Sequence, residues 1–145
     1  MRAHKLFFSY HNCMETFKGT IIEESLEDKS VLNNVKIVST RISQVGEKHR
    51  TPWIKQWTLH KVYIEPGEVD AITTQISKSL DSNHKHSWYA DFKNENTHYV
   101  IYRDRIFKID RTKVEEYLKA RKYGLALGIP SYQIDFEKDV KKFEQ

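Results

Sequence analysis

The segment from Ser82 to Asp110 holds the residues best suited to chemistry, because histidines and carboxylates alternate there with aromatic side chains. His84 and His86 are two residues apart, and Asp91 and His98 follow them. Imidazole and carboxylate groups bind first-row metals, and side chains two apart on an extended segment point the same way. No third ligand has a diagnostic spacing, so we interpret the histidine pair as part of an exposed loop. We predict no metal site and no cofactor.

The same residue types could support acid/base catalysis. A catalytic base has to lie within hydrogen-bond reach of its partner and be oriented by a third group, which spacing alone does not supply. The candidate catalytic residues of a small enzyme with a His/Asp pair are His86, Asp91 and His60. Cys13 is interpreted as a small buried apolar residue. The chain has no glycine-rich phosphate loop, no G-x-S-x-G and no H-E-x-x-H, so the enzyme classes marked by those motifs lack support.

Two segments combine cations with large planar side chains, and they favour a binding function. Aromatic faces stack on bases while cations contact phosphates, and a sheet can display both. We therefore expect a ligand that is anionic and partly aromatic, such as a nucleotide or single-stranded nucleic acid, where the loop 47–57 approaches the hairpin 88–105. The predicted ligand-binding residues are Arg50, Trp53, Lys55, Trp57, Trp88, Lys93 and Arg103. The alternative is that these aromatic residues pack the core or form cross-strand pairs.

Length and composition indicate one domain over residues 1–145, with 39% hydrophobic and 30% charged residues. The formal net charge of +4 favours anionic partners only mildly. A single cysteine permits no intrachain disulfide, which is typical of a reducing compartment. No stretch is long and apolar enough for a signal peptide or a membrane span. We expect a cytoplasmic protein without a membrane partner.

The pattern of apolar residues predicts an α+β fold. β-branched and aromatic runs bounded by turn residues predict strands, and apolar residues at helical spacing predict two helices. The expected strands are 5–10, 34–45, 56–65, 88–93 and 98–104, with 105–110 continuing the last after a tight bend, and the expected helices are 67–80 and 112–125. The segment 13–34 remains unassigned, although "FKGTIIEE" favours a strand. Strands 34–45 and 56–65, and likewise 88–93 and 98–104, should form antiparallel hairpins.

The second predicted helix has a defined start and a defined inner face. Thr112 and Glu115 match the capping box, in which the two side chains satisfy free backbone amides. Its buried face should consist of Val114, Tyr117, Leu118, the stem of Arg121 and Leu125. The whole fold is then a mostly antiparallel sheet of about five strands with both helices on one face. The sequence leaves open whether residues 137–145 form an ordered helix or a frayed tail.

Three stretches of the chain resemble a family of small conserved prokaryotic proteins of unknown function. They are "SWYADFKNENTHYVIYRDRIFKID", "YGLALGIPSYQIDF" and "YHNCMETFKGT". The resemblance spans most of the chain and supports a single domain, but it implies no activity, cofactor or catalytic residue.

A third functional alternative is a homodimeric protein-interaction module. A sheet whose exposed face carries Tyr, Trp and Phe has apolar area to hide, and symmetric self-association would bury it. Pairing of edge strands is a second route to a dimer. The sequence thus leaves a binding module, a small enzyme and a homodimeric module open.

Overall fold

The computed structural model describes residues 15–84 and 87–141, which form an antiparallel sheet with helices on both of its faces. The strands are β1 (Phe17–Ile22), β2 (Lys36–Gln44), β3 (Gln56–Ile64), β4 (Tyr89–Lys93), β5 (Thr97–Tyr102) and β6 (Arg105–Asp110). The helices are α2 (Val69–Ser79) and α3 (Val114–Ala126), accompanied by short 3-10 turns. The expected α+β class is confirmed. No helix among the described residues is long and apolar enough to cross a membrane.

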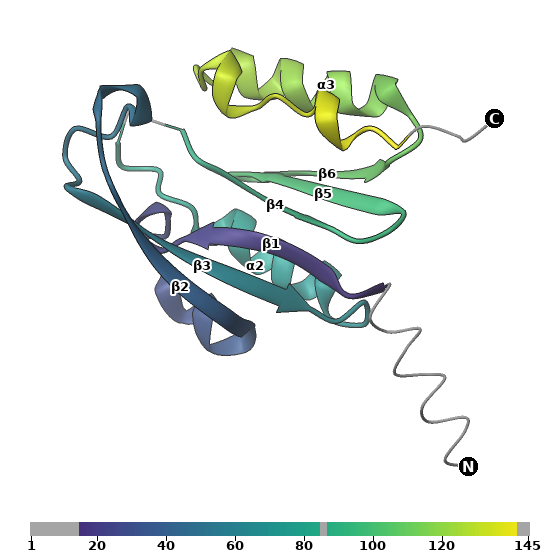
Figure 1. Cartoon of the computed structure of the whole chain (residues 1–145), viewed down its shortest axis with the longest axis horizontal. Helices are drawn as coiled ribbons and strands as arrows, with labels where there is room; N and C mark the ends of the chain where they lie inside the picture. Colours follow the sequence, from purple (N-terminus) through teal and green to yellow (C-terminus); the bar gives the residue numbers. More distant parts are fainter. Residues whose placement is uncertain (1–14, 85–86, 142–145) are drawn as a thin grey trace, which may run out of the picture.

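The sheet has six strands in the order β2-β3-β1-β4-β5-β6, and every neighbouring pair is antiparallel. The two predicted hairpins are confirmed as β2–β3 and β4–β5. The sixth strand, β1, comes from the segment that the sequence left unassigned, and it lies between the two hairpins (Figure 1). The expected strand at 5–10 lies outside the described residues.

Gly19 allows β1 to occupy this central place. It lies opposite Val62 of β3 and Phe92 of β4. A Cβ atom at this position would lie 2.1 Å from the backbone oxygen of Asp91 and 2.6 Å from the Phe92 ring. Glycine within a strand often marks such a close backbone approach. The residue that weakened the strand signal in the sequence is therefore required by the sheet.

α2 covers one face of the sheet. Its buried side chains Val69, Ile72 and Ile76 recur at helical spacing, as the sequence predicted, and belong to one core with Phe17 of β1 and Val62 of β3. In Figure 1, α2 lies behind β1 and β3. The observed helix is one or two residues shorter at each end than the predicted range 67–80, which is the usual uncertainty of helix boundaries.

α3 covers the opposite face, so the prediction of both helices on one face is wrong. The reason lies in β5, which is buried on both sides. Tyr99 and Ile101 belong to the α2 core, whereas Val100 and Tyr102 form a second core with α3. Alternate side chains of a strand point to opposite faces, and the continuous apolar run of β5 therefore requires a cover on each face.

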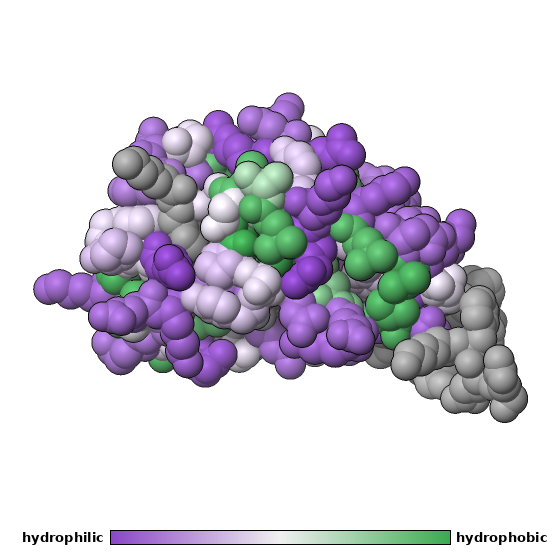
Figure 2. Space-filling model, turned by 90° about the horizontal axis from the view of Figure 1, so that it is seen from above, coloured by the Kyte–Doolittle hydropathy of each residue, from purple (hydrophilic) through white to green (hydrophobic). Residues whose placement is uncertain are grey.

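The buried face of α3 agrees with the prediction only in part. Tyr117 faces the sheet as predicted and is joined by Ala120 and Gly124, while Val114 and Leu118 are 50% and 58% exposed. Small residues allow the helix to approach closely, because a Cβ on Gly124 would lie 2.6 Å from the Tyr102 hydroxyl oxygen. That hydroxyl donates a hydrogen bond to the Ala120 carbonyl at 2.7 Å. Figure 2, which looks onto this side of the molecule, shows hydrophobic residues within a largely hydrophilic surface.

The predicted capping box is not formed. α3 begins after Lys113 without a side-chain cap. The Thr112 hydroxyl instead donates to Asp110 Oδ1 at 2.7 Å, and the Glu116 carboxylate accepts from the Asp110 amide at 3.0 Å. Asp110 at the end of β6 thus binds the Thr112 hydroxyl, which would otherwise have been free to cap the helix.

The segment 129–141 returns along α3 and packs beside β4. Ile134, Phe136 and Asp139 are buried, and the Lys141 amide donates to the Arg111 carbonyl at 2.6 Å. Residues 137–141, for which the sequence left an ordered helix or a frayed tail open, therefore lie against the core next to the buried Phe136. Residues 142–145 lie outside the described part.

The first prediction concerns the central strand. Gly19→Ala should destabilise the fold by about 1–3 kcal/mol, because the added methyl overlaps the β4 backbone rather than a flexible side chain. Urea unfolding followed by circular dichroism measures this change. Gly67→Ala is the matched control, since nothing lies within 4 Å of its added Cβ, and its effect should stay within about 0.5 kcal/mol. Equal stability of the two variants would contradict the close approach.

Candidate functional site

The candidate site lies where α3 leaves the sheet uncovered. α3 and the segment 129–141 cover β4, β5 and β6 on their face, while no helix of the described residues covers β1, β2 and β3 there (Figure 1). We call this surface the open sheet face. Its residues are Lys18, Thr20, Ile22, Lys36, Ser39, Arg41, Leu59, Lys61 and Tyr63.

Cross-strand register fixes the neighbours on the open sheet face. Thr20 lies opposite Lys61 on one side and Asp91 on the other. Lys18 lies opposite Tyr63, and its Nζ is 5.2 Å from the centre of the Tyr63 ring. Directly opposed residues share a face, so cations and an aromatic ring alternate along adjacent strands.

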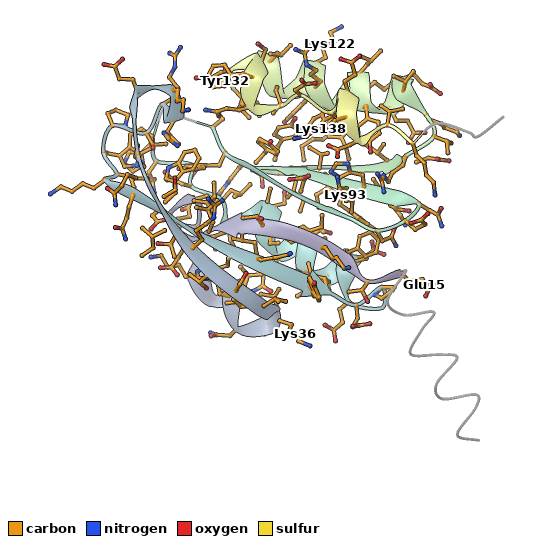
Figure 3. All side chains as sticks on the ribbon, in the orientation of Figure 1. Glu15, Lys36, Lys93, Lys122, Tyr132 and Lys138 are labelled. Atoms are coloured by element: carbon orange, nitrogen blue, oxygen red, sulfur yellow. The ribbon has the colours of Figure 1, made fainter. Side chains whose placement is uncertain are left out.

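The cations of the open sheet face are available to a ligand. Lys18, Lys36, Arg41 and Lys61 are exposed, and within the described ranges none of them has a carboxylate at ion-pair distance. Lys36 lies at the outer end of β2 (Figure 3). Uncompensated like charges on one face create a positive potential that attracts anions and that salt screens.

A cavity of about 260 Å³ adjoins the open sheet face at the start of β4. We call it the tryptophan cavity. Its apolar walls are Ile22, Trp57, Leu59, Trp88, Tyr89 and Ala90, and its polar groups come from Thr20, Ser87, Asp91 and Gln133. The Trp57 and Trp88 ring centres are 5.5 Å apart. The cavity therefore has aromatic walls and one carboxylate.

The β2–β3 loop holds Trp57 in place. The Trp57 Nε1 donates to Thr51 Oγ1 at 3.0 Å, and the His49 ring lies edge-on at 4.5 Å. The loop is tied to the C-terminal segment, because the Tyr132 hydroxyl donates to the Lys48 carbonyl at 2.6 Å. The loop thus meets the start of β4 at the Trp57 and Trp88 side chains.

Asp91 is held from behind by a chain of hydrogen bonds. Its Oδ2 lies 2.7 Å from His98 Nε2, and His98 Nδ1 lies 2.9 Å from the Tyr117 hydroxyl. The Tyr117 hydroxyl donates to the Asp139 backbone oxygen at 3.1 Å. The His98 side chain is fully buried, whereas the Asp91 side chain is 37% exposed. The arrangement fixes a carboxylate at the cavity wall, where it can accept a proton or a hydrogen bond.

Of the predicted catalytic residues that the structure describes, Asp91 lies at this site and His60 does not. The imidazole bonded to Asp91 is that of His98, and His86 lies outside the described residues. His60 points to the α2 face, where its ring bonds Thr40 Oγ1 and Glu23 Oε1, each at 2.8 Å. The bond from His60 lowers the pKa of Glu23. These contacts make His60 a structural residue.

The seven predicted ligand-binding residues separate into three groups. Trp57 and Trp88 line the tryptophan cavity. Arg50, Trp53 and Lys55 are exposed on the β2–β3 loop, where the Trp53 ring stacks on His84 with ring centres 4.3 Å apart. Lys93 and Arg103 are engaged elsewhere.

Lys93 and Arg103 are held by carboxylates. Lys93 forms an ion pair with Asp139 between β4 and the C-terminal segment (Figure 3). Arg103 bonds Glu27 at 2.6 Å and also the Leu80 carbonyl, near the end of α2. Neither side chain is available to a ligand as a free cation, so this part of the predicted site is not assembled.

The ligand-binding residues predicted from the sequence did not include Lys18, Arg41, Lys61 or Tyr63. The alternation of side chains in "FKGTII" and "LHKVYI" was an available signal, because it places Lys18 on the same face of its strand as Thr20, and Lys61 on the same face as Tyr63. Without an assignment for β1, however, nothing placed these residues beside Asp91.

Neither a metal centre nor a relative identifies the site. Among residues 15–84 and 87–141, no group of three or more His, Cys, Asp or Glu side chains could hold a metal ion. Comparison with protein-family models, curated proteins and solved structures found no match. The resemblance to a prokaryotic family therefore stays a prediction, and the function has to be inferred from the geometry.

The second prediction tests the hydrogen-bond chain behind Asp91. Tyr117→Phe should lower the free energy of unfolding by about 1–3 kcal/mol, because it removes the hydroxyl between the buried His98 ring and the Asp139 carbonyl. Tyr123→Phe is the control, since the Tyr123 hydroxyl makes no hydrogen bond within the described residues. Chemical denaturation of both variants provides the comparison. A Tyr117 variant as stable as the control would show that the chain contributes nothing.

The third prediction concerns alkaline pH. Burial raises the pKa of Tyr117 to about 12 from an ordinary value of 10.0, and it raises the pKa of Tyr89, Tyr99 and Tyr102 still further. Neutral phenols are thus favoured in the folded state, so their contribution is complete below pH 10 and is lost as the pH rises toward 12.

We expect the free energy of unfolding to fall over that range. We also expect native tyrosinate absorbance to show fewer than eight tyrosines ionising near pH 10. Simultaneous ionisation of all tyrosines near that pH, with the fold intact, would contradict the assigned burial.

Proposed function

We propose that the protein binds single-stranded nucleic acid or a nucleotide, with one base in the tryptophan cavity and the phosphates on the open sheet face. The observation that carries the proposal is the continuity of the two surfaces. Thr20 borders the cavity and also lies opposite Lys61 in the adjacent strand. The aromatic walls of the tryptophan cavity and the free cations of the open sheet face therefore lie next to each other.

The size of the cavity favours a base over a whole nucleotide. At about 260 Å³ it is smaller than the ~300–1,000 Å³ typical of sites that enclose drug-sized ligands. It suits one planar ring system, while a sugar and a phosphate would remain outside. Stacking of a base on aromatic side chains contributes about 1–3 kcal/mol.

The nearest free cation has a suitable position. Lys61 follows Leu59, a cavity residue, by two positions in β3, which is about 7 Å along an extended strand. Lys18 and Arg41 lie on the neighbouring strands. A phosphate attached to a base in the cavity would thus meet Lys61 first, and a longer strand would meet the other cations.

Two alternatives each have one supporting observation. A small enzyme is supported by the 2.7 Å bond between Asp91 and His98, but the buried imidazole leaves only the carboxylate to meet a substrate. A homodimeric module is supported by the exposed apolar residues of α3, Val114, Leu118 and Leu125. We favour the binding function because it uses both the cavity and the free cations, and we place it in the cytoplasm on the single cysteine.

The fourth prediction tests binding directly. A fluorescently labelled single-stranded oligonucleotide of mixed sequence should bind at about 50 mM salt and bind progressively more weakly as salt rises, because each phosphate contact releases counterions. The double variant Lys18→Ala/Lys61→Ala should weaken binding and lower the slope of log affinity against log salt by about 1–2. Fluorescence anisotropy measures both quantities.

The matched control is Lys78→Ala/Lys122→Ala, which removes two exposed cations from α2 and α3. It should bind nearly as well as the wild type. Loss of affinity equal to that of the first double variant would assign binding to net charge alone. Absence of binding at low salt would refute the proposed function.

A further inference from the structure

We infer that Asp91 selects the base that enters the tryptophan cavity, and that it favours a base with an exocyclic amino group (cytosine, adenine or guanine) over thymine or uracil. The inference rests on the proposed function and adds the class of base. It assigns Asp91 a role in specificity rather than in affinity for phosphate.

Asp91 presents one free acceptor to the cavity. Oδ2 bonds His98 Nε2 at 2.7 Å, while Oδ1 has no hydrogen-bond partner in the described part of the chain. Among the described residues that line the cavity, Asp91 is also the only charged one. An ionised carboxylate accepts hydrogen bonds and donates none. The cavity wall therefore offers an anionic acceptor with one oxygen in use and one available.

The buried partners hold this acceptor in a single orientation. His98 is fully buried between Asp91 and Tyr117, and the Tyr117 hydroxyl is itself bonded to the Asp139 backbone. Since His98 Nε2 faces a group that only accepts, the nitrogen carries the shared proton. A carboxylate fixed in this way loses little freedom when a ligand binds, which favours geometric selection.

The edges of the bases differ in the way that this acceptor can distinguish. Cytosine presents the N4 amino group and adenine the N6 amino group, and both donate hydrogen bonds. Thymine presents the O4 acceptor at the corresponding position. A carboxylate accepts a hydrogen bond from an amino group, but it would face the lone pairs of O4 and lose its contact with water. Leaving a buried polar group unpaired is what makes such discrimination strong.

The other polar groups of the cavity do not provide this selection. The Thr20 and Ser87 hydroxyls can both donate and accept, so they can serve either type of base. The backbone oxygen of Gln133 already accepts from the Tyr89 hydroxyl, and its side-chain Nε2 donates to the Lys48 carbonyl at 3.1 Å. Asp91 thus supplies the anionic acceptor among the described lining residues.

The test compares two pyrimidines, so that ring size and stacking area stay nearly constant. Labelled oligo(dC) and oligo(dT) of equal length are titrated with the full chain at one salt concentration and slightly alkaline pH. We expect oligo(dC) to bind about tenfold more tightly, the factor that corresponds to about 1.4 kcal/mol. Oligo(dA) should also exceed oligo(dT).

The variant Asp91→Asn should reverse the preference. In this variant the Tyr117 hydroxyl can donate its single proton to His98 Nδ1 at 2.9 Å instead of to the Asp139 backbone oxygen. We then expect Nε2 to keep the ring proton, to hold the amide oxygen and to leave the amide NH₂ facing the cavity. That group donates to O4 of thymine and opposes the amino group of cytosine. We expect oligo(dT) to bind as tightly as oligo(dC) or more tightly, whereas Lys61→Ala should weaken both to the same extent.

The outcomes separate the inference from the proposed function. If wild-type protein binds both homopolymers but does not prefer oligo(dC), the selection by Asp91 is wrong and the binding function stands. If it binds neither, the proposed function is wrong. Thermal unfolding shows whether Asp91→Asn folds, and if it does not, the wild-type ratio of the two affinities decides alone. A folded variant that keeps the wild-type preference would overturn the role of Asp91.

Discussion

The close contact of β1 with β4 at Gly19 is the constraint on which the rest of the molecule depends. Strand β1 joins two parts of the sheet that are each local in sequence, the β2–β3 hairpin and the β4–β5–β6 meander. Only a residue without a side chain fits between Val62 and Phe92 while the Asp91 backbone lies so near. Because of this junction, Lys61 of the first part and Asp91 of the second flank the same Thr20. The candidate site exists only because β1 is inserted.

Burial of β5 on both faces explains why the two halves of the sheet are covered by different helices. Its side chains supply both cores, so α2 and α3 have to lie on different faces. α2 reaches across to β1 and β3, whereas α3 is held over β5 and β6 by the small contact residues Ala120 and Gly124. Within the part of the chain that the structure describes, the α3 face of β1, β2 and β3 is left without a helix. An uncovered half-sheet bearing free cations is a feature that stability alone does not require.

The two buried histidines, His60 and His98, have different roles on the two faces of the sheet. His60 is satisfied on the α2 face by Thr40 and Glu23, and its contacts end there. His98 is satisfied within the α3 core by Tyr117, but its other nitrogen holds Asp91 at the cavity wall. The same residue type is structural in one place and positions a site residue in the other. Burial and partners, rather than the presence of histidine, decide which role applies.

The sequence by itself determined the α+β class, both hairpins and the two helices, because these follow from local periodicity and turn residues. It named Asp91, Trp57 and Trp88 as candidates, and the structure brings all three to one cavity. It placed Tyr117 on the inner face of α3, but it expected Val114 and Leu118 there too, whereas Ala120 and Gly124 complete that face. Only the tertiary structure decided that Lys93 and Arg103 are paired with Asp139 and Glu27, while Lys18 and Lys61 have no carboxylate partner among the described residues. Ion pairs between residues far apart in the chain depend on strand order and on the face that each side chain occupies, and neither is encoded in local spacing.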